Sequence, residues 1–263
     1  MAEHVELDHL AVTAESTWEL WQRYGAELGG RLVGGGPTSG FHWSQVRFGG
    51  GMKIEMLEPR DVEEFDFLRR FLDRHGPGPH HLTFKVPHLA TSIEEVEAAG
   101  ATVVGVDLDS ETWKEAFLHP ASACGIVVQI AQEGGDDDPE LTEVAPAPRH
   151  GATAHLDRIV HLVPDLGAAL ALFAGPLRGE AAAEGDDGGR WVELRWPGPG
   201  RLRLLEPVDG ELRAWLGDRP GRLHHVAFTH PDPQRIDGAK PVEDAWEIAP
   251  GDHHGVRIRL RSG

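Results

Sequence analysis

Two pairs of adjacent histidines are the residues of this chain best placed to do chemistry, because each pair opens an alternating run after a turn. The first run extends from residue 76 to 86 and the second from 221 to 228. Each is typical of a strand whose successive side chains face opposite ways. His80 then shares a mostly apolar face that needs a core, whereas His81 shares a polar face that we expect to line a cavity. One such pair could simply cap a strand, but its recurrence in two halves favours a function.

The composition limits what that function can be. The chain has 263 residues and a formal net charge of −18 at pH 7, which disfavours sequence-independent binding to nucleic acid or to an anionic membrane surface. No apolar run approaches the ~20 residues of a spanning helix, and the N-terminus lacks a signal-peptide pattern. Together with a single cysteine, Cys124, these features predict a cytoplasmic protein. With sixteen His and one Cys, a metal site would be built from nitrogen and oxygen ligands.

The predicted elements repeat along the chain. Hydrophobic periodicity in the first half predicts two β-α-β-β-β units joined by a helix over 62–75. The first unit has a strand over 5–12, a helix over 14–28 capped by Thr13, and strands over 31–33, 42–48 and 52–57. The second has the strand of His81, a helix over 92–99, and strands over 102–108, 112–119 and 125–131. A linker over 133–150, rich in Gly, Asp and Pro, separates these units from a second half.

Offsets between matching residues indicate that the second half duplicates the first. The matching pairs and their offsets are His9 with Arg158 (149), Glu55 with Arg203 (148), His81 with His225 (144) and Gln129 with Arg259 (130). The drop to 130 places a shortening in 231–244, so we expect the fourth helix to be lost or vestigial. The pattern predicts an α+β fold of tandem βαβββ units in two cupped mixed sheets, the last unit shortened. It also predicts two domains, 1–132 and 151–263.

Five short motifs in the first half carry a family resemblance. They are Leu7-Asp8-His9, Lys53-Ile54-Glu55-Met56-Leu57-Glu58-Pro59, Gly78-Pro79-His80-His81-Leu82-Thr83-Phe84, Ala116-Phe117-Leu118-His119-Pro120 and Gly125-Ile126-Val127-Val128-Gln129. Together they resemble the vicinal oxygen chelate superfamily of glyoxalases, bleomycin-resistance proteins and extradiol dioxygenases, and the first half is most similar to the methylmalonyl-CoA epimerases. The resemblance implies an open, cupped sheet whose hollow holds a divalent metal ion. It also implies either a monomer, in which the second half acts as an internal partner, or a homodimer.

The same resemblance implies a metal-ligand set of His9, Glu55, His81 and Gln129, although the family usually has Glu where this chain has Gln129. Two imidazoles with a carboxylate and an amide oxygen suit Fe²⁺, Mn²⁺, Co²⁺, Ni²⁺ or Zn²⁺, and a bound ion would polarise a substrate carbonyl. His9, His81 and Glu55 also supply the two His and one carboxylate that an extradiol-type dioxygenase needs. The alternative is an ancestral site that no longer binds metal.

The epimerase and glyoxalase reactions need a base that removes a proton next to a carbonyl, and Gln129 cannot accept that proton. His42 and Glu115 are the candidate bases, with packing for His42 and an ion pair for Glu115 as the alternatives. The leading hypothesis is a metal-dependent enzyme acting on a small oxygenated or acyl-thioester substrate. Its reaction would be of the isomerase or epimerase, lyase or dioxygenase type. The other hypothesis is a non-catalytic ligand-binding or resistance protein of the same fold.

Arginines occupy three ligand-equivalent positions of the second half, and three guanidinium groups cannot bind a cation. Either Arg158, Arg203 and Arg259 hold an anion such as a carboxylate, phosphate or sulfate, or acids such as Glu193 neutralise them in an inactive site. The histidines near strand ends, including His253 and His254, are expected to be exposed. The run 136–138 of three aspartates is expected to be solvated.

Overall fold

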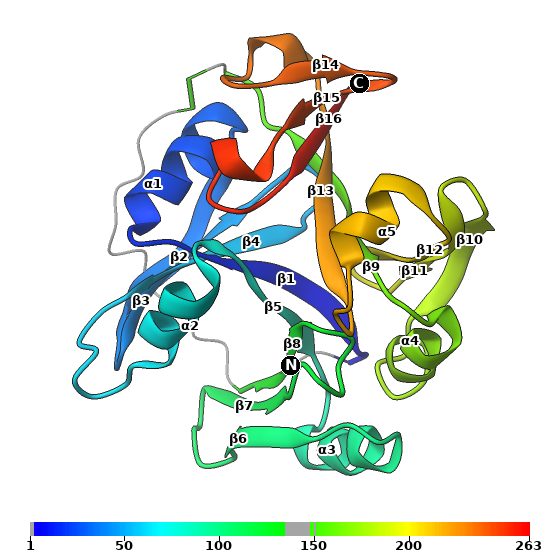
Figure 1. Cartoon of the computed structure of the whole chain (residues 1–263). Coiled ribbons are helices and arrows are strands. Elements are labelled where there is room, and N and C mark those ends of the chain that lie inside the picture. Colours follow the sequence, from blue (N-terminus) through cyan, green and yellow to red (C-terminus); the bar gives the residue numbers. More distant parts are fainter. Residues whose placement is uncertain (1–2, 135–147, 150) are drawn as a thin grey trace. The chain divides into compact units, whose positions relative to one another are not determined.

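In the described residues of the computed structural model, sixteen strands form two eight-stranded mixed sheets (Figure 1). The structure describes residues 3–134, 148–149 and 151–263. The aspartate run 136–138 and most of the predicted linker lie outside the described residues. We call the sheet of the first eight strands sheet A and that of the last eight strands sheet B.

Sheet A has the strand order β2-β3-β4-β1-β5-β8-β7-β6. β5 and β8 pair in parallel, whereas β2–β3, β3–β4, β6–β7 and β7–β8 pair antiparallel. Its strands are β1 (Glu6–Thr13), β2 (Arg31–Thr38), β3 (Phe41–Arg47), β4 (Lys53–Pro59), β5 (Gly78–Lys85), β6 (Val103–Asp107), β7 (Trp113–Leu118) and β8 (Val127–Glu133).

Sheet B repeats this order as β10-β11-β12-β9-β13-β16-β15-β14. The parallel pairs include β9–β12 and β13–β16. Its strands are β9 (His155–Leu162), β10 (Glu180–Gly185), β11 (Gly189–Arg195), β12 (Arg201–Pro207), β13 (Arg222–His230), β14 (Lys240–Val242), β15 (Ala245–Ile248) and β16 (Ile258–Ser262). The same order in both sheets confirms the predicted α+β fold of tandem βαβββ units.

Helices connect the strands of each unit. They are α1 (Thr17–Trp21), which continues as the π-helix η1 (Gln22–Glu27), α2 (Phe67–His75), α3 (Leu89–Ala98), α4 (Leu166–Phe173), α5 (Gly210–Leu216) and the 3₁₀ turns η2 (Pro233–Arg235) and η3 (Pro250–Asp252). The fourth unit has only the three-residue turn η2 where the other units have a helix. The prediction of a lost or vestigial fourth helix is therefore confirmed.

The start of the first helix was predicted wrongly. Thr13 belongs to β1, is fully buried and donates its hydroxyl to the carbonyl oxygen of Leu57, 3.2 Å away. Ser16 caps α1 instead, because its hydroxyl accepts the backbone N–H of Trp18 at 3.2 Å. The sequence also failed to predict β10, whose residues are exposed along most of its length. A strand of that kind has no alternation between buried and exposed side chains to read.

Packing divides the chain into two compact units that do not follow the two sheets. Unit 1 comprises Met1–His9, His81–Asp137 and Arg158–His224, and unit 2 comprises Leu10–His80, Asp138–Asp157 and His225–Gly263. In unit 1, the ring of Phe84 packs on Phe173 and Trp196 at centroid distances of 6.1 and 5.3 Å. In unit 2, Phe48 packs on Tyr24 and Phe228 at 6.4 and 5.1 Å. Each core thus joins strands of the first half to elements of the second half.

None of the helices in the described part of the chain is long and apolar enough to cross a membrane. The division into domains 1–132 and 151–263 stays a prediction.

Candidate metal centre

Three residues far apart in the sequence present metal-ligating atoms close together. His9 on β1, Glu55 on β4 and His81 on β5 each offer one ligand atom, and these three atoms all lie within 4.8 Å of one another. His9 and His81 are buried, at 1% and 5% exposure, and their ring centroids are 5.9 Å apart. Two imidazoles and one carboxylate form a donor set that suits divalent Fe, Mn, Co, Ni or Zn. The residues present therefore fit a divalent metal ion.

A carboxylate orients the His9 ring. The Nδ1 atom of His9 lies 2.7 Å from Oδ2 of the buried Asp8. Asp8 in turn lies 3.5 Å from the ammonium of Lys85, which also donates to Glu133 at 3.0 Å. Burial alone would lower the pKa of Lys85, but Asp8 and Glu133 raise it, so the ammonium stays charged beside Asp8. Carboxylates bonded to the second ring nitrogen of a histidine commonly fix its orientation in metal sites.

The hydroxyl of Thr83 bridges two of the four predicted ligands. Its Oγ1 lies 2.8 Å from Nε2 of His9 and donates to Oε1 of Gln129 at 2.6 Å. The amide nitrogen of Gln129 donates to Oε2 of Glu115 at 2.6 Å, and Trp113 Nε1 donates to the same oxygen at 3.0 Å. Gln129 is therefore tied to His9 through Thr83, and directly to the candidate base Glu115.

The other candidate base, His42, lies on β3, the strand that pairs with the strand of Glu55. Gln45 on β3 faces Glu55 across the strand pair and donates to its Oε1 at 3.1 Å. Because side chains alternate along a strand, His42, three residues earlier, points to the opposite face of β3. It is buried there, at 7% exposure. The structure thus brings Glu115 to Gln129, one of the predicted ligands, whereas a role of His42 as the base stays a prediction.

His80 is buried against aromatic rings, and the charge of Glu55 also acts on it. Its ring packs on Phe71 and Phe67 at centroid distances of 4.8 and 6.0 Å. Burial lowers the pKa of His80 to about 4, so its imidazole is neutral at pH 7. A packing role follows from these contacts.

The arginines of sheet B are paired with carboxylates. In unit 1, Glu193 Oε2 accepts from Arg158 at 2.9 Å and from Arg203 at 3.1 Å. The guanidinium of Arg203 also stacks on Trp191, 3.8 Å from the ring centroid. Burial, and then the neighbouring Arg158, lower the pKa of Arg203. Glu193 is the acidic neighbour that sequence analysis offered as one of two alternatives.

Arg259 has its own carboxylate in unit 2. Its Nε donates to Oε2 of Glu247 at 3.0 Å, and Arg257 donates to Oε1 of the same residue. No pattern in the sequence pointed to Glu247, because the shortened fourth unit has no counterpart motif around it. Anion binding by Arg158, Arg203 and Arg259 stays a prediction.

Sequence reasoning also missed the roles of Asp8 and Thr83. Both signals were present in the sequence: Asp8 is adjacent to the predicted ligand His9, and Thr83 shares the polar strand face of His81. His253 was predicted wrongly as exposed. It is only 3% exposed, and its ring packs on Tyr24 at a centroid distance of 5.0 Å.

The fold and the cluster define a glyoxalase-like protein with a histidine- and carboxylate-lined centre. Residues 8–117, which include His9, Glu55 and His81, match the model of the Glyoxalase/Bleomycin resistance protein/Dioxygenase superfamily. This stretch of the first half is therefore similar to the superfamily that its motifs indicated.

One solved structure shares the fold over nearly the whole chain, and others align with about half of it. A variant of 4-hydroxymandelate synthase from Streptomyces coelicolor aligns over 98% of this chain and 92% of its own, with a TM-score of 0.67 and 13% identity. Methylmalonyl-CoA epimerase from Mycobacterium tuberculosis aligns over 51% of this chain and 93% of its own, with a TM-score of 0.45 and 21% identity. A hypothetical protein from Bacillus halodurans C-125 aligns over 51% of this chain and 99% of its own, with a TM-score of 0.46 and 25% identity. No curated protein sequence matches the chain.

Proposed function

We propose that the chain is a metal-dependent enzyme that binds a divalent cation through His9, Glu55 and His81, with Gln129 as a fourth ligand. The observation that carries this proposal is the clustering of the three ligand atoms within 4.8 Å. The proposed substrate is a small oxygenated compound or acyl thioester.

Each residue around the centre has a distinct part in this proposal. Asp8 keeps the His9 ring oriented, and Gln45 does the same for Glu55. Glu115, hydrogen-bonded to Gln129, is the carboxylate that would take or return a proton next to a substrate carbonyl. A bound divalent ion would polarise the substrate oxygen atoms. The reaction class that fits these parts is proton transfer in an isomerase, epimerase or lyase.

Two other readings fit specific observations. The set of two His and one carboxylate is also the donor set of iron-dependent oxygenases, which supports a dioxygenase. The burial of His42, at 7% exposure, suits a packing role, which supports a ligand-binding or resistance protein without catalysis.

Metal content and turnover separate these proposals. Protein purified without added metal is analysed for bound elements, stripped with a chelator and titrated calorimetrically with Fe²⁺, Mn²⁺, Co²⁺, Ni²⁺ and Zn²⁺. We expect one tight site for at least one of these ions, and absence of any such site would refute a metal-dependent function.

The loaded protein is then given two probes. Deuterium exchange into methylmalonyl-CoA indicates proton transfer, whereas oxygen uptake with catechol and Fe²⁺ indicates a dioxygenase. Saturable binding of catechol, which presents two adjacent oxygens, without any turnover would favour the ligand-binding protein.

A further inference from the structure

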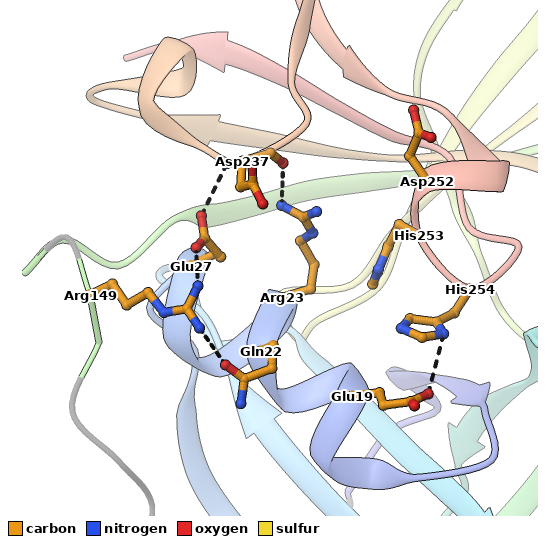
Figure 2. Close-up of a pocket in the computed structure, with 9 residues that line it drawn as sticks. All are labelled: Glu19, Gln22, Arg23, Glu27, Arg149, Asp237, Asp252, His253 and His254. Atoms are coloured by element: carbon orange, nitrogen blue, oxygen red, sulfur yellow. Dashed lines mark hydrogen bonds and ion pairs between the residues drawn. The ribbon is translucent and has the colours of Figure 1, made fainter.

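Unit 2 contains a surface cavity of about 150 Å³, lined by residues other than those of the metal centre (Figure 2). Its walls come from α1 and η1, from Arg149, from the segment after η2 and from the turn η3. All of its lining side chains are polar or charged. At roughly 30 Å³ for each water molecule, the cavity has room for a ligand of only a few heavy atoms.

One side of the cavity is already neutralised by its own partners. Arg149 donates to Oε1 of Glu27 at 2.6 Å and also to the side chain of Gln22. The other oxygen of Glu27 accepts the backbone N–H of Asp237 at 3.1 Å. These groups hold the wall together and leave little capacity to bind a ligand.

Arg23, in the middle of the cavity in Figure 2, has a guanidinium with few partners. It donates through Nη1 to the backbone carbonyl of Asp237 at 2.7 Å, and its buried Nε has no hydrogen-bond partner. Among the described residues, no carboxylate lies within the 4.0 Å of an ion pair with Arg23. Burial lowers the pKa of Arg23, partly offset by the charges of Glu27 and Asp237. A partly buried guanidinium in this state is a ready partner for a carboxylate.

His253 lines the same cavity and is the second group with unused capacity. It is 3% exposed, and its Nε2 is buried without a hydrogen-bond partner. Burial, followed by the charge of Arg23, lowers the pKa of His253 well below its usual value. The neutral imidazole can carry its proton on Nε2 and donate it to a ligand oxygen.

The remaining wall is acidic. Glu19 and Asp252 are exposed and lie on either side of His253 and His254 in Figure 2. Each has one basic side chain near it: His254 is 3.8 Å from Glu19, and Lys240 is 3.3 Å from Asp252. A purely anionic ligand would be repelled by these carboxylates, and a purely cationic one by Arg23.

We propose that this cavity binds a small α-amino acid as its zwitterion. The ligand carboxylate would pair with Arg23 and accept from Nε2 of His253, while the ammonium group would face Glu19 and Asp252. Such a ligand adds no net charge to the cavity. The small volume restricts it to short side chains.

L-Alanine is the probe, with propionate and ethylammonium as analogues that each keep one of its two charges. Calorimetric titration of the full chain should show saturable binding of alanine. Each analogue should bind at least about 10-fold more weakly than alanine, because it lacks one charge-assisted contact. Addition of alanine should also shift the imidazole NMR signals of His253. Binding of ethylammonium alone, or no response to any of the three compounds, would overturn the proposal.

Arg23→Gln should weaken alanine binding by about 10-fold or more. Arg235→Gln, in the nearby turn η2, is the matched control, because Arg235 pairs only with Asp232 across 3.9 Å. Asp252→Asn, at an exposed position that does not threaten folding, should weaken alanine and leave propionate unchanged or tighter. Equal affinity for alanine in Arg23→Gln and wild type would sink the assignment. So would a His253 shift produced by Zn²⁺ and not by alanine.

Discussion

Sheets A and B contain equivalent cross-strand pairs that differ in charge. In sheet A, Gln45 lies opposite Glu55, and in sheet B, Glu193 lies opposite Arg203. Both members of the pair are separated by 148 residues from their counterparts. In sheet A the carboxylate accepts from a neutral amide, whereas in sheet B the carboxylate accepts from a charged guanidinium. Sheet B therefore contains its own counter-charge, whereas the carboxylate of Glu55 in sheet A clusters with two histidines.

β8 of sheet A and β16 of sheet B also differ in the charge of equivalent residues. Gln129 of sheet A is next to Thr83 and Phe117, whereas Arg259 of sheet B is next to Ala227 and Glu247. Sheet B has alanine where sheet A has the hydroxyl of Thr83, and the carboxylate of Glu247 where sheet A has the ring of Phe117. The two sheets thus share backbone positions, but sheet A carries the cluster of His and Glu side chains and sheet B carries internal ion pairs. If this view is correct, substitutions at equivalent positions will have different consequences in the two sheets.

The largest difference concerns metal affinity. We expect His81→Ala to weaken divalent-metal binding by more than about 100-fold, since even residues that only orient a ligand contribute about 10- to 100-fold. His225→Ala at the equivalent position of sheet B should leave the affinity unchanged. His80→Ala is the matched control in sheet A. It should cost about 1–3 kcal/mol of folding stability without loss of metal binding. Titration calorimetry on the four proteins decides, and equal affinity for wild type and His81→Ala would contradict the assignment.

A pH-dependent difference comes from His161 of β9, which replaces Val12 of β1 at an offset of 149. His161 is fully buried and its Nε2 donates to the carbonyl of Cys124 at 2.7 Å. Burial lowers the pKa of His161 to about 4 from the ordinary value of 6.5. Between pH 4 and 6.5, His161 is therefore protonated in the unfolded chain but neutral in the folded chain. Stability is therefore complete above pH 6.5 and should fall by about 3 kcal/mol as the pH drops to 4.

His161→Gln isolates this contribution, because its amide can still donate to Cys124 but does not titrate. Urea unfolding at several pH values should show a shallower loss of stability below pH 6.5 in His161→Gln than in wild type. Parallel curves for the two proteins would show that His161 is protonated in the folded state.

The two cross-strand carboxylates should differ in their effect on stability. Glu193→Gln removes the partner of both Arg158 and Arg203, whose side chains are only 24% and 21% exposed. Breaking a fully buried pair costs about 3–5 kcal/mol, so about 2 kcal/mol is expected at this partial exposure. Glu55→Gln in metal-free protein should cost less than about 1 kcal/mol, because Gln45 is a neutral partner. Urea unfolding measures both, and a greater loss for Glu55→Gln would reverse the comparison.

The features that could be predicted from sequence are those that depend on strand alternation and repetition. The offsets between His9, Glu55, His81 and their counterparts revealed the duplicated sheets, and alternation separated His81 from His80. The contacts that side chains make across strands were not accessible, because register decides them. The link from Thr83 to Gln129 and the contact of Gln45 with Glu55 depend on such register. Glu247 lies in the shortened unit, where no repeat remained to align.

The amide of Gln129 is matched to Glu115, and exchanging the two residues tests this match. Gln129→Glu would place a carboxylate at the 2.6 Å contact with Glu115, where two like charges repel. We expect a loss of about 1–3 kcal/mol in metal-free protein. The double variant Gln129→Glu/Glu115→Gln restores one donor and one acceptor, so it should recover most of that loss. A double-mutant cycle by urea unfolding measures the coupling, and strictly additive effects would show that the contact contributes nothing.

The smallest effect is expected at Thr83, where sheet B has Ala227. The single hydroxyl proton of Thr83 is donated to Gln129, so its oxygen can only accept from Nε2–H of His9. A metal ion bound at Nε2 would need that proton and that contact to be lost. Thr83→Val removes this competing bond, and a net hydrogen bond is worth about 1 kcal/mol. The variant should therefore bind the metal about 5-fold tighter, while its metal-free form loses about 1 kcal/mol of stability. Thr83→Ser keeps the hydroxyl and should match wild type in both measurements. If Thr83→Val instead binds the metal more weakly, the hydroxyl supports the ligands and does not compete for them, and the loss of the hydroxyl in sheet B is then part of how that sheet ceased to bind a cation.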